Sequence, residues 1–391
     1  MSEGKGKHIA YFAAGIAVTV AVSAGYQFGA GVVADATGKT APDSAAAKQK
    51  VKEICHIIDD QYLFEKEDSA LADSMYAGLL EGLDDPYSCY YTQEEYEKIS
   101  QSNEGHFEGI GVVLIQDADT GAVTVAYCYE GGPASKAGVQ AGDVIAAVNE
   151  TSVEGMELSE ISDKIARSES AISLRLYRES TDEQIEVEVT KAEVEIPSVS
   201  WEMKENQTGY LAINQFTGVT AQQFQEAYQK LQEEGMTALI VDLRDNTGGL
   251  LTGVCDTLKC FMPEGLLVYT EDKKGNKEEY RCEGETPIEI PLVVLINENS
   301  ASAAEIFAGA VQDHKVGTLV GVTTYGKGIV QKPFLLDDGS VIKLTISAYY
   351  TPDGKNIHGK GIKPDVTVEQ PKEAKEDLQL EKAMEILRAG N

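Results

Sequence analysis

Basic side chains are scarce in this chain of 391 residues. Lysine and arginine together number 33, whereas aspartate and glutamate number 64, so the formal net charge at pH 7 is −31. A surface this acidic repels phosphate backbones and anionic lipid headgroups, so nucleic acid is excluded as an expected ligand. The length allows two or three domains, each with a proper core.

Histidine is also scarce, which matters because it is the usual base for an activated serine. Only five histidines occur, and none stands in a motif that suggests a catalytic triad: His8, His56, His106, His314 and His358. A lysine can replace histidine as the base if burial lowers its pKa enough to populate the neutral amine. Pairs of serine and lysine are a variant of the serine triad.

Paired cysteine motifs are absent. The six cysteines form no CxxC pair and have no spacing with histidine that suits zinc: Cys55, Cys89, Cys128, Cys255, Cys260 and Cys282. Disulfides are permitted outside the cytosol, but buried thiols are the better interpretation in a chain of this length. The sequence therefore predicts no metal and no cofactor, and it leaves the redox state of the cysteines open.

A strand that feeds a helix provides a place for a nucleophile. The apolar run Pro291–Ile296 is followed by small and hydroxyl residues and then by a helical period, with Ser300 and Ser302 at the corner. Ser300 is the weaker candidate, because it suits the N-cap of the helix. Further along, Lys327 is framed by glycines, and Gln331 follows four residues later. Taken alone, these short patterns also fit close helix packing and an exposed turn.

Two segments in this region resemble the carboxyl-terminal processing peptidases, also called tail-specific proteases. One reads Ser-Ala-Ser-Ala-Ala-Glu and ends at Glu305, and the other reads Gly-Lys-Gly-Ile-Val-Gln and ends at Gln331. Their order and interval also resemble those of the family. The resemblance implies that Ser302 is the nucleophile, that Lys327 is the general base and that Gln331 orients the lysine. It further implies supporting roles for Glu305 and Asp313.

A third segment follows the continuous apolar strand at residues 237–243. It reads Asp-Leu-Arg-Asp-Asn-Thr-Gly-Gly and resembles the family's glycine-containing turn. The resemblance implies an oxyanion hole made by the N–H of Gly248 or Gly249 together with the N–H of Ala303. Thr247 stands where the family commonly has proline or glycine, which leaves the local turn open. The family segment Asp-Pro-Tyr-Ser is matched at residues 85–88, and we assign no chemistry to it beyond packing or self-association.

Residues 105–192 resemble a PDZ domain. Because Gly109 and Gly111 have no side chains, they can leave backbone N–H groups accessible to a terminal carboxylate. Two turn-and-strand segments follow, at residues 132–139 and 141–149, and then a helix at residues 158–167. A peptide would join the sheet edge as an added strand. Its apolar end residue would enter a pocket lined by Ile110 and Val112 on the sheet side and by Ile161 and Ile165 on the helix side.

The N-terminal segment predicts a membrane anchor. Residues 9–33 are apolar or small with few exceptions and carry no charge, and Lys5 and Lys7 precede them. A segment of this length can span a bilayer with its positive flank in the cytoplasm, which places the remainder on the extracytoplasmic side. We favour an uncleaved signal anchor, although residues 34–36 resemble a cleavage site, and cleavage would release a secreted form.

The resemblance to the carboxyl-terminal processing peptidases implies an α/β chain with a core like those of ClpP and crotonase, and with an inserted PDZ domain. The expected regions are an anchor at 1–36, a linker and helical region at 37–104, the PDZ domain at 105–192, the protease core at 193–368 and a charged tail at 369–391. The tail is expected to end in a helix at residues 378–387. A CoA-handling relative of crotonase would share the core but would not explain the PDZ segment.

The resemblance implies a serine endopeptidase that binds accessible, apolar C-termini of extracytoplasmic proteins through its PDZ domain. The alternative is a membrane-tethered PDZ adaptor whose protease-like core is inactive. The expected partners are protein substrates held by their C-terminal tails and the membrane. A regulatory protein and a homodimer are left open, as are the substrate's identity and the state of the catalytic pair at rest.

Overall fold

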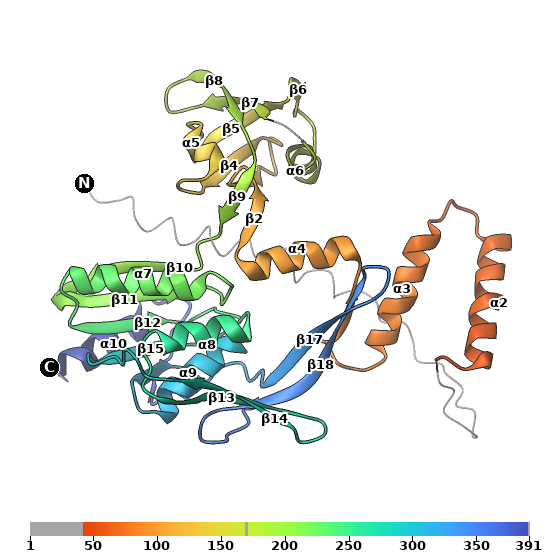
Figure 1. Cartoon of the computed structure of the whole chain (residues 1–391). Helices are drawn as coiled ribbons and strands as arrows, with labels where there is room; N and C mark the ends of the chain where they lie inside the picture. The colour runs from red at the N-terminus through yellow and green to blue at the C-terminus, as the bar shows by residue number, and fades with distance from the viewer. Residues whose placement is uncertain (1–41, 169–170, 390–391) are drawn as a thin grey trace. The chain divides into compact units, whose positions relative to one another are not determined.

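The described part of the chain forms two units. The computed structural model describes residues 42–168 and 171–389 (Figure 1). Of the described residues, one unit includes 42–66 and 108–194, and the other includes 67–107 and 195–389. The predicted anchor at residues 9–33 lies outside the described residues. Among the residues that are described, no helix is both long and apolar enough to cross a membrane.

A six-stranded sheet forms the centre of the larger unit. Its order is β10 (Val199–Lys204), β11 (Thr208–Ile213), β12 (Ala238–Asp242), β15 (Leu292–Ile296), β16 (Thr318–Gly321) and β19 (Val366–Thr367). Only the pair β10–β11 is antiparallel. Every residue of β12 and β15 is buried. Burial on both faces explains why these two strands are continuous apolar runs without alternation.

Helices cover both faces of this sheet. One face packs against α7 (Thr220–Glu233), α8 (Leu251–Lys259) and α9 (Ala303–Asp313), and the other packs against α10 (Leu378–Ala389). The predicted terminal helix is therefore part of the core, because Ala383 and Leu387 are buried against the sheet. Arg244 ties this helix to the end of β12, since its guanidinium donates to Asp242 at 2.6 Å and to Asp377 at 2.8 Å.

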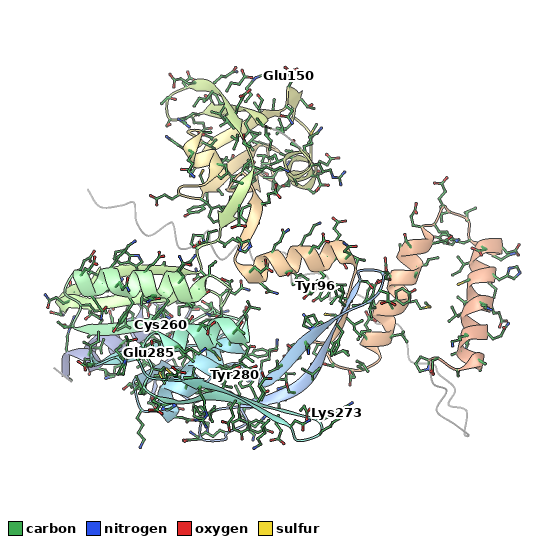
Figure 2. The ribbon with its side chains drawn as sticks, in the orientation of Figure 1. Tyr96, Glu150, Cys260, Lys273, Tyr280 and Glu285 are labelled. Atoms are coloured by element: carbon green, nitrogen blue, oxygen red, sulfur yellow. The ribbon has the colours of Figure 1, made fainter. Side chains whose placement is uncertain are left out.

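A second, antiparallel sheet in the same unit has a long hairpin, seen in Figure 1. The hairpin consists of β17 (Ile329–Leu335) and β18 (Val341–Tyr350). Strand β18 also pairs with β1 (Cys89–Tyr91) and with β13 (Gly265–Asp272), which pairs with β14 (Lys277–Cys282). Tyr280 of β14, labelled in Figure 2, packs against the core. In the sequence, β1 lies between α3 (Asp68–Glu81) and α4 (Gln93–Glu104). The segment at residues 85–88 comes immediately before β1 and therefore lies next to the hairpin strand β18, with which β1 pairs.

The other unit contains the predicted PDZ elements. Its sheet has the order β3 (Val112–Gln116), β4 (Val123–Cys128), β5 (Asp143–Val148), β7 (Ile172–Arg178) and β8 (Glu183–Val189), with β6 (Thr151–Ser152) beside β5. Two helices accompany this sheet, α5 (Pro133–Lys136) and α6 (Leu158–Ala166), and β2 (His106–Gly109) pairs with β9 (Ala192–Glu195). Helix α2 (Ala45–Gln61) contributes no buried residue.

A buried ion pair fastens the PDZ sheet, and we predict that breaking it is costly. The guanidinium of Arg178 lies 2.7 Å from the carboxylate of Asp143, whose side chain is 1% exposed. Burial opposes the charge of Asp143, but Arg178 holds the pKa of that carboxyl below its ordinary value. Arg178→Met leaves this carboxylate buried without its charged partner, although the N–H of Gln140 still donates to it at 2.9 Å. We therefore expect the free energy of unfolding of this unit to fall by about 3–5 kcal/mol. Hydrogen exchange in β5 and β7 measures that loss.

The exposed pair of Arg167 and Asp163 supplies the control for this prediction. Their side chains are 83% and 63% exposed. Arg167→Met removes the same charge, and we expect it to cost less than about 1 kcal/mol. Equal losses in the two variants would contradict the prediction.

Candidate active site

Ser302 is the N-cap of α9, at the corner between β15 and that helix. The interpretation of Ser300 as the N-cap is wrong. Ser300 is fully buried, and its hydroxyl donates to the carbonyl of Leu243 at 2.8 Å and accepts from the N–H of Asn297 at 2.9 Å. The hydroxyl of Ser300 therefore fastens the turn to the end of β12.

The backbone of Ser302 is strained. Its φ of 54° and ψ of −115° lie in a region that residues other than glycine rarely adopt. Such a conformation costs about 1–3 kcal/mol and persists only where the surroundings enforce it. Two hydrogen bonds do so: the N–H of Ser302 donates to Glu305 Oε2 at 2.9 Å, and the hydroxyl of the buried Tyr349 donates to the Ser302 carbonyl at 3.0 Å. Stored strain of this kind is concentrated at functional sites.

Glu305 joins the serine corner to the lysine loop. Its side chain is fully buried on α9. Besides the N–H of Ser302, its carboxylate accepts from the N–H of Gly326 and the N–H of Lys327, each at 2.8 Å, and from the hydroxyl of Thr324 at 2.5 Å. Burial raises the pKa of this carboxyl, and the four donors work in the opposite direction. Because one side chain binds both backbones, the position of Lys327 is fixed relative to that of Ser302.

The amine of Lys327 lies in an environment that disfavours its charge. Burial lowers its pKa below the ordinary value of 10.5, and the nearby ammonium of Lys343 lowers it further, whereas Asp85 and Glu305 act in the opposite sense. The amine lies 4.4 Å from the centre of the Tyr87 ring. A lysine with a lowered pKa is the kind of group that can accept the proton of a serine.

The three residues of the expected catalytic set are not joined by hydrogen bonds to one another. Among the described residues, no hydrogen bond connects the side chain of Lys327 to Ser302 or to Gln331. The amide of Gln331 instead donates to the hydroxyl of Thr345 at 3.2 Å. The backbones are thus in place, whereas the side chains are not yet arranged for proton transfer.

The glycine turn lies directly beside Ser302. A Cβ added to Gly248 would come within 2.8 Å of the Cβ of Ser302, and the φ values of Gly248 and Gly249 are 112° and 134°. The N–H of Gly248 donates to the side chain of the buried Asn246 at 2.8 Å. Within the described chain, the N–H groups of Gly249 and Ala303 have no hydrogen-bond partner. These two are therefore the donors available to a developing oxyanion.

Models of three protein families match the chain. Peptidase family S41 matches residues 207–368, a PDZ domain matches residues 124–178, and the N-terminal domain of the activating protease CtpB matches residues 20–95. The carboxy-terminal processing protease CtpA of Bacillus subtilis is 35% identical over 339 residues, which cover 86% of this chain and 72% of that relative. This chain belongs to the carboxyl-terminal processing proteases of peptidase family S41.

Other relatives agree. A carboxyl-terminal-processing protease of Synechocystis sp. is 32% identical over 323 residues, which cover 80% of this chain and 76% of the relative. A solved structure of a photosystem II D1 C-terminal processing protease is 28% identical, with a TM-score of 0.48, over 82% of this chain and 87% of that one. Membership of peptidase family S41 makes this a serine-type protease, and its α/β core with a PDZ domain confirms the predicted fold class.

Tyr87 is a residue of the protease site that the sequence did not reveal. It belongs to the segment that was left without chemistry, and its ring faces the amine of Lys327. The turn is fixed to the hairpin because the hydroxyl of Ser88 accepts from the N–H of Thr345 at 3.0 Å and donates to Asp85 at 2.6 Å. Burial and the neighbouring Tyr325 hydroxyl raise the pKa of Tyr87 to about 12. The segment's resemblance to the family was the one signal that could have indicated it.

The remaining predicted residues of the protease lie elsewhere. Asp313 ends α9, about 16 Å along the helix from Ser302, and accepts from Lys355 and from the N–H of Asp353. It therefore braces the segment after β18. In the PDZ unit, Gly109 ends β2 and Val112 starts β3, while Gly111 has a φ of 77°. Three side chains predicted to line the peptide pocket are buried in the PDZ core: Ile110, Ile161 and Ile165.

The environment of Lys327 predicts how the activity of the protease depends on pH. A general base works only as the neutral amine, so kcat/KM should rise with pH, tenfold per unit, through the pKa of Lys327 and then level off. Because burial lowers this pKa, the midpoint of the rise should lie below pH 10.5. Peptide hydrolysis between pH 5 and 11 measures the profile. A rise centred at or above pH 10.5 would show that the lysine is not desolvated.

Proposed function

We propose that this protease cleaves extracytoplasmic proteins whose apolar C-termini it binds through its PDZ unit, with Ser302 as nucleophile and Lys327 as general base. The single observation that carries the assignment is the binding of both backbones by Glu305. Supporting observations are the strained backbone of Ser302 and the lowered pKa of Lys327.

The proposed reaction has two stages. Ser302 Oγ attacks the scissile carbonyl while its proton passes to the amine of Lys327, and the oxyanion accepts hydrogen bonds from the N–H groups of Gly249 and Ala303. The lysine then protonates the leaving amine. Water hydrolyses the acyl-enzyme by the same proton route in reverse. Gln331 takes part by exchanging its bond to Thr345 for one to Lys327.

Recognition of an apolar chain end is proposed from the PDZ unit. Its loop at Gly109–Gly111 contains N–H groups suited to a terminal carboxylate, and among the described residues those of Ile110 and Gly111 have no hydrogen-bond partner. Because Ile161 and Ile165 are buried, an apolar end residue has to displace packed side chains as it binds.

The test compares peptides that differ only at their ends. The full chain should cleave a peptide that ends in a free apolar residue, and amidation of that end should slow cleavage at least about tenfold. Replacement of the end residue by aspartate should have a similar effect. Ser302→Ala gives the background rate of cleavage. Equal rates for free and amidated peptides would contradict recognition of the chain end while leaving the peptidase assignment intact.

The location is proposed from the uncharged segment at residues 9–33, which follows Lys5 and Lys7. An anchor of this kind leaves the PDZ unit and the core outside the cytoplasm. Digestion of intact cells with an added protease should remove both units. Their survival until the cells are lysed would contradict the proposal.

A further inference from the structure

A second lysine lies on the same face of the hairpin as Gln331. In the pairing of β17 with β18, Gln331 lies opposite Thr345 and Pro333 lies opposite Lys343. Alternate residues of a strand share a face, so Lys343, Thr345 and Gln331 point to the same side. On the other edge of β18, Lys343 lies opposite Cys89 of β1. Three strands therefore bring Lys343 to the neighbourhood of the lysine loop.

The amine of Lys343 has an aromatic partner and no acidic one. It donates to the hydroxyl of Tyr91 at 2.8 Å and lies 5.2 Å from the centre of that ring. Within the described part of the chain, neither Lys343 nor Lys327 forms an ion pair with a carboxylate, although acidic residues outnumber basic ones 64 to 33. Both amines lie beside the same short stretch of chain, because that of Lys327 lies 4.4 Å from the centre of the Tyr87 ring and that of Lys343 donates to Tyr91, four residues further on.

The two lysines differ in their protonation. Burial opposes the charge of Lys343, yet its hydrogen bond to Tyr91 and the nearby Cys89 raise its pKa above the ordinary value. Burial lowers the pKa of Lys327, and the charge of Lys343 is the next cause in size. Lys343 thus loses its proton at a higher pH than Lys327 does.

Two carboxylates and one ring favour the charged form of Lys327. These are Asp85, from the turn before β1, Glu305, from α9, and the ring of Tyr87. Hydrogen bonds to Ser88 and to the N–H of Tyr87 bind the carboxylate of Asp85, and four donors bind that of Glu305. Among the charged groups that act on Lys327, the ammonium of Lys343 is the one that opposes them.

We propose that Lys343 is a positioning residue for the base: its fixed positive charge on the Gln331 face of the hairpin keeps Lys327 in the neutral form that accepts the proton of Ser302. The inference rests on the proposed function, in which Lys327 is the base. It adds a second lysine to the site, one that acts on the first and does not touch the substrate.

The test follows the pH dependence of a single chemical step. A fluorophosphonate acts on Ser302 by forming an Oγ–P bond and releasing fluoride, while the serine proton goes to Lys327. The rate of this reaction rises with pH as Lys327 loses its proton, and this rising part of the curve is its acid limb. In the full chain, Lys343→Met should move the acid limb to higher pH, so that the rate at a fixed pH on that limb falls roughly three- to tenfold. The plateau at high pH should be unchanged. Lys343→Arg, which keeps the charge, should largely preserve the profile.

Lys332 supplies the matched control. It lies next to Pro333 on β17, on the opposite face of the hairpin, and its side chain is exposed. Lys332→Met removes the same charge from the same hairpin and should leave the profile where it is. Tyr91→Phe is the second variant. It leaves Lys343 in place without its hydrogen bond and should shift the limb in the same direction as Lys343→Met, by a smaller amount.

Each outcome decides the inference. An unshifted limb in Lys343→Met overturns it, as does a loss of equal size at all pH values, because a packing defect would lower the plateau as well. If Lys343→Met does not fold, an unshifted limb in Tyr91→Phe overturns it. If Lys327→Ala reacts with the fluorophosphonate as fast as the unaltered chain, the proposed function itself has failed. If Lys327→Ala is inert and Lys343→Met is unshifted, only the further inference has failed.

Discussion

Lys327→Ala is expected to lower the rate of peptide cleavage by about 10⁴-fold or more, to the level of Ser302→Ala. A serine without its base keeps only the contribution of the oxyanion hole and of substrate binding. Because the two residues act as a unit, the double variant should be no slower than either single one. Hydrolysis of a peptide with a free apolar end measures all three rates. If Lys327→Ala retained activity, Lys327 would not be the general base.

Stability measurements separate this loss from misfolding. Burial lowers the pKa of Lys327 in the folded chain, so the unfolded chain binds more protons and folding becomes more favourable as pH rises. Below the folded-state pKa, the buried lysine therefore costs stability. Lys327→Met should unfold at an equal or higher urea concentration at pH 7. Its advantage should shrink as the pH rises from the folded-state pKa of Lys327 to 10.5 and should be absent above that pH. A large loss of stability in that variant would mean that the lysine has a structural role.

Glu305→Gln is expected to lower kcat by about 10²-fold or more and the free energy of unfolding by about 3 kcal/mol. The carboxylate accepts four hydrogen bonds. An amide has a single acceptor oxygen, and its nitrogen faces either the N–H groups of both Ser302 and Lys327 or the N–H of Gly326 and the hydroxyl of Thr324. The serine corner and the lysine loop then separate, and a small displacement of reacting groups is costly. Peptide hydrolysis and urea unfolding measure the two effects.

Glu298 provides the comparison for this variant. It lies in the same turn, before α9, and its side chain is exposed. Glu298→Gln makes the same chemical change away from the four donors. It should change neither kcat nor the free energy of unfolding measurably. If Glu305→Gln behaved in the same way, the carboxylate would not be what holds Ser302 and Lys327 together.

Much of the fold could be predicted from local pattern. The continuous apolar runs that became β12 and β15 and the turn after each are visible in the sequence, and so is the helical period that became α9. The roles of Ser302 and Lys327 came from the family resemblance and remain predictions that the geometry supports. The distinction between Ser300 and Ser302 required the structure, because both serines precede the helix and only the three-dimensional turn decides which one caps it.

The contributions of Tyr87 and Lys343 could not be predicted, for a topological reason. Tyr87 meets the lysine loop because β1 pairs with β18, strands separated by some 250 residues, and the same pairing places Tyr91 beside the amine of Lys343. No periodicity in either segment indicates such a partner. The hydrogen bond from the N–H of Gly248 to the side chain of Asn246 could not be predicted either. A glycine in a sequence indicates conformational freedom, but it does not indicate the direction in which its N–H points. Sequence pattern thus located the segments of the site, whereas the orientation of their atoms depended on long-range pairing.

The burial of α10 has a consequence for the layering of the core. Ala383 and Leu387 pack beneath the central sheet against β12, β15 and β16, and Arg244 holds Asp377 beside the end of β12. The sheet face opposite α7, α8 and α9 is therefore closed by a helix that follows the last strand of the sheet in the sequence. A fragment that stopped before residue 378 would leave the apolar side chains of that face in contact with water.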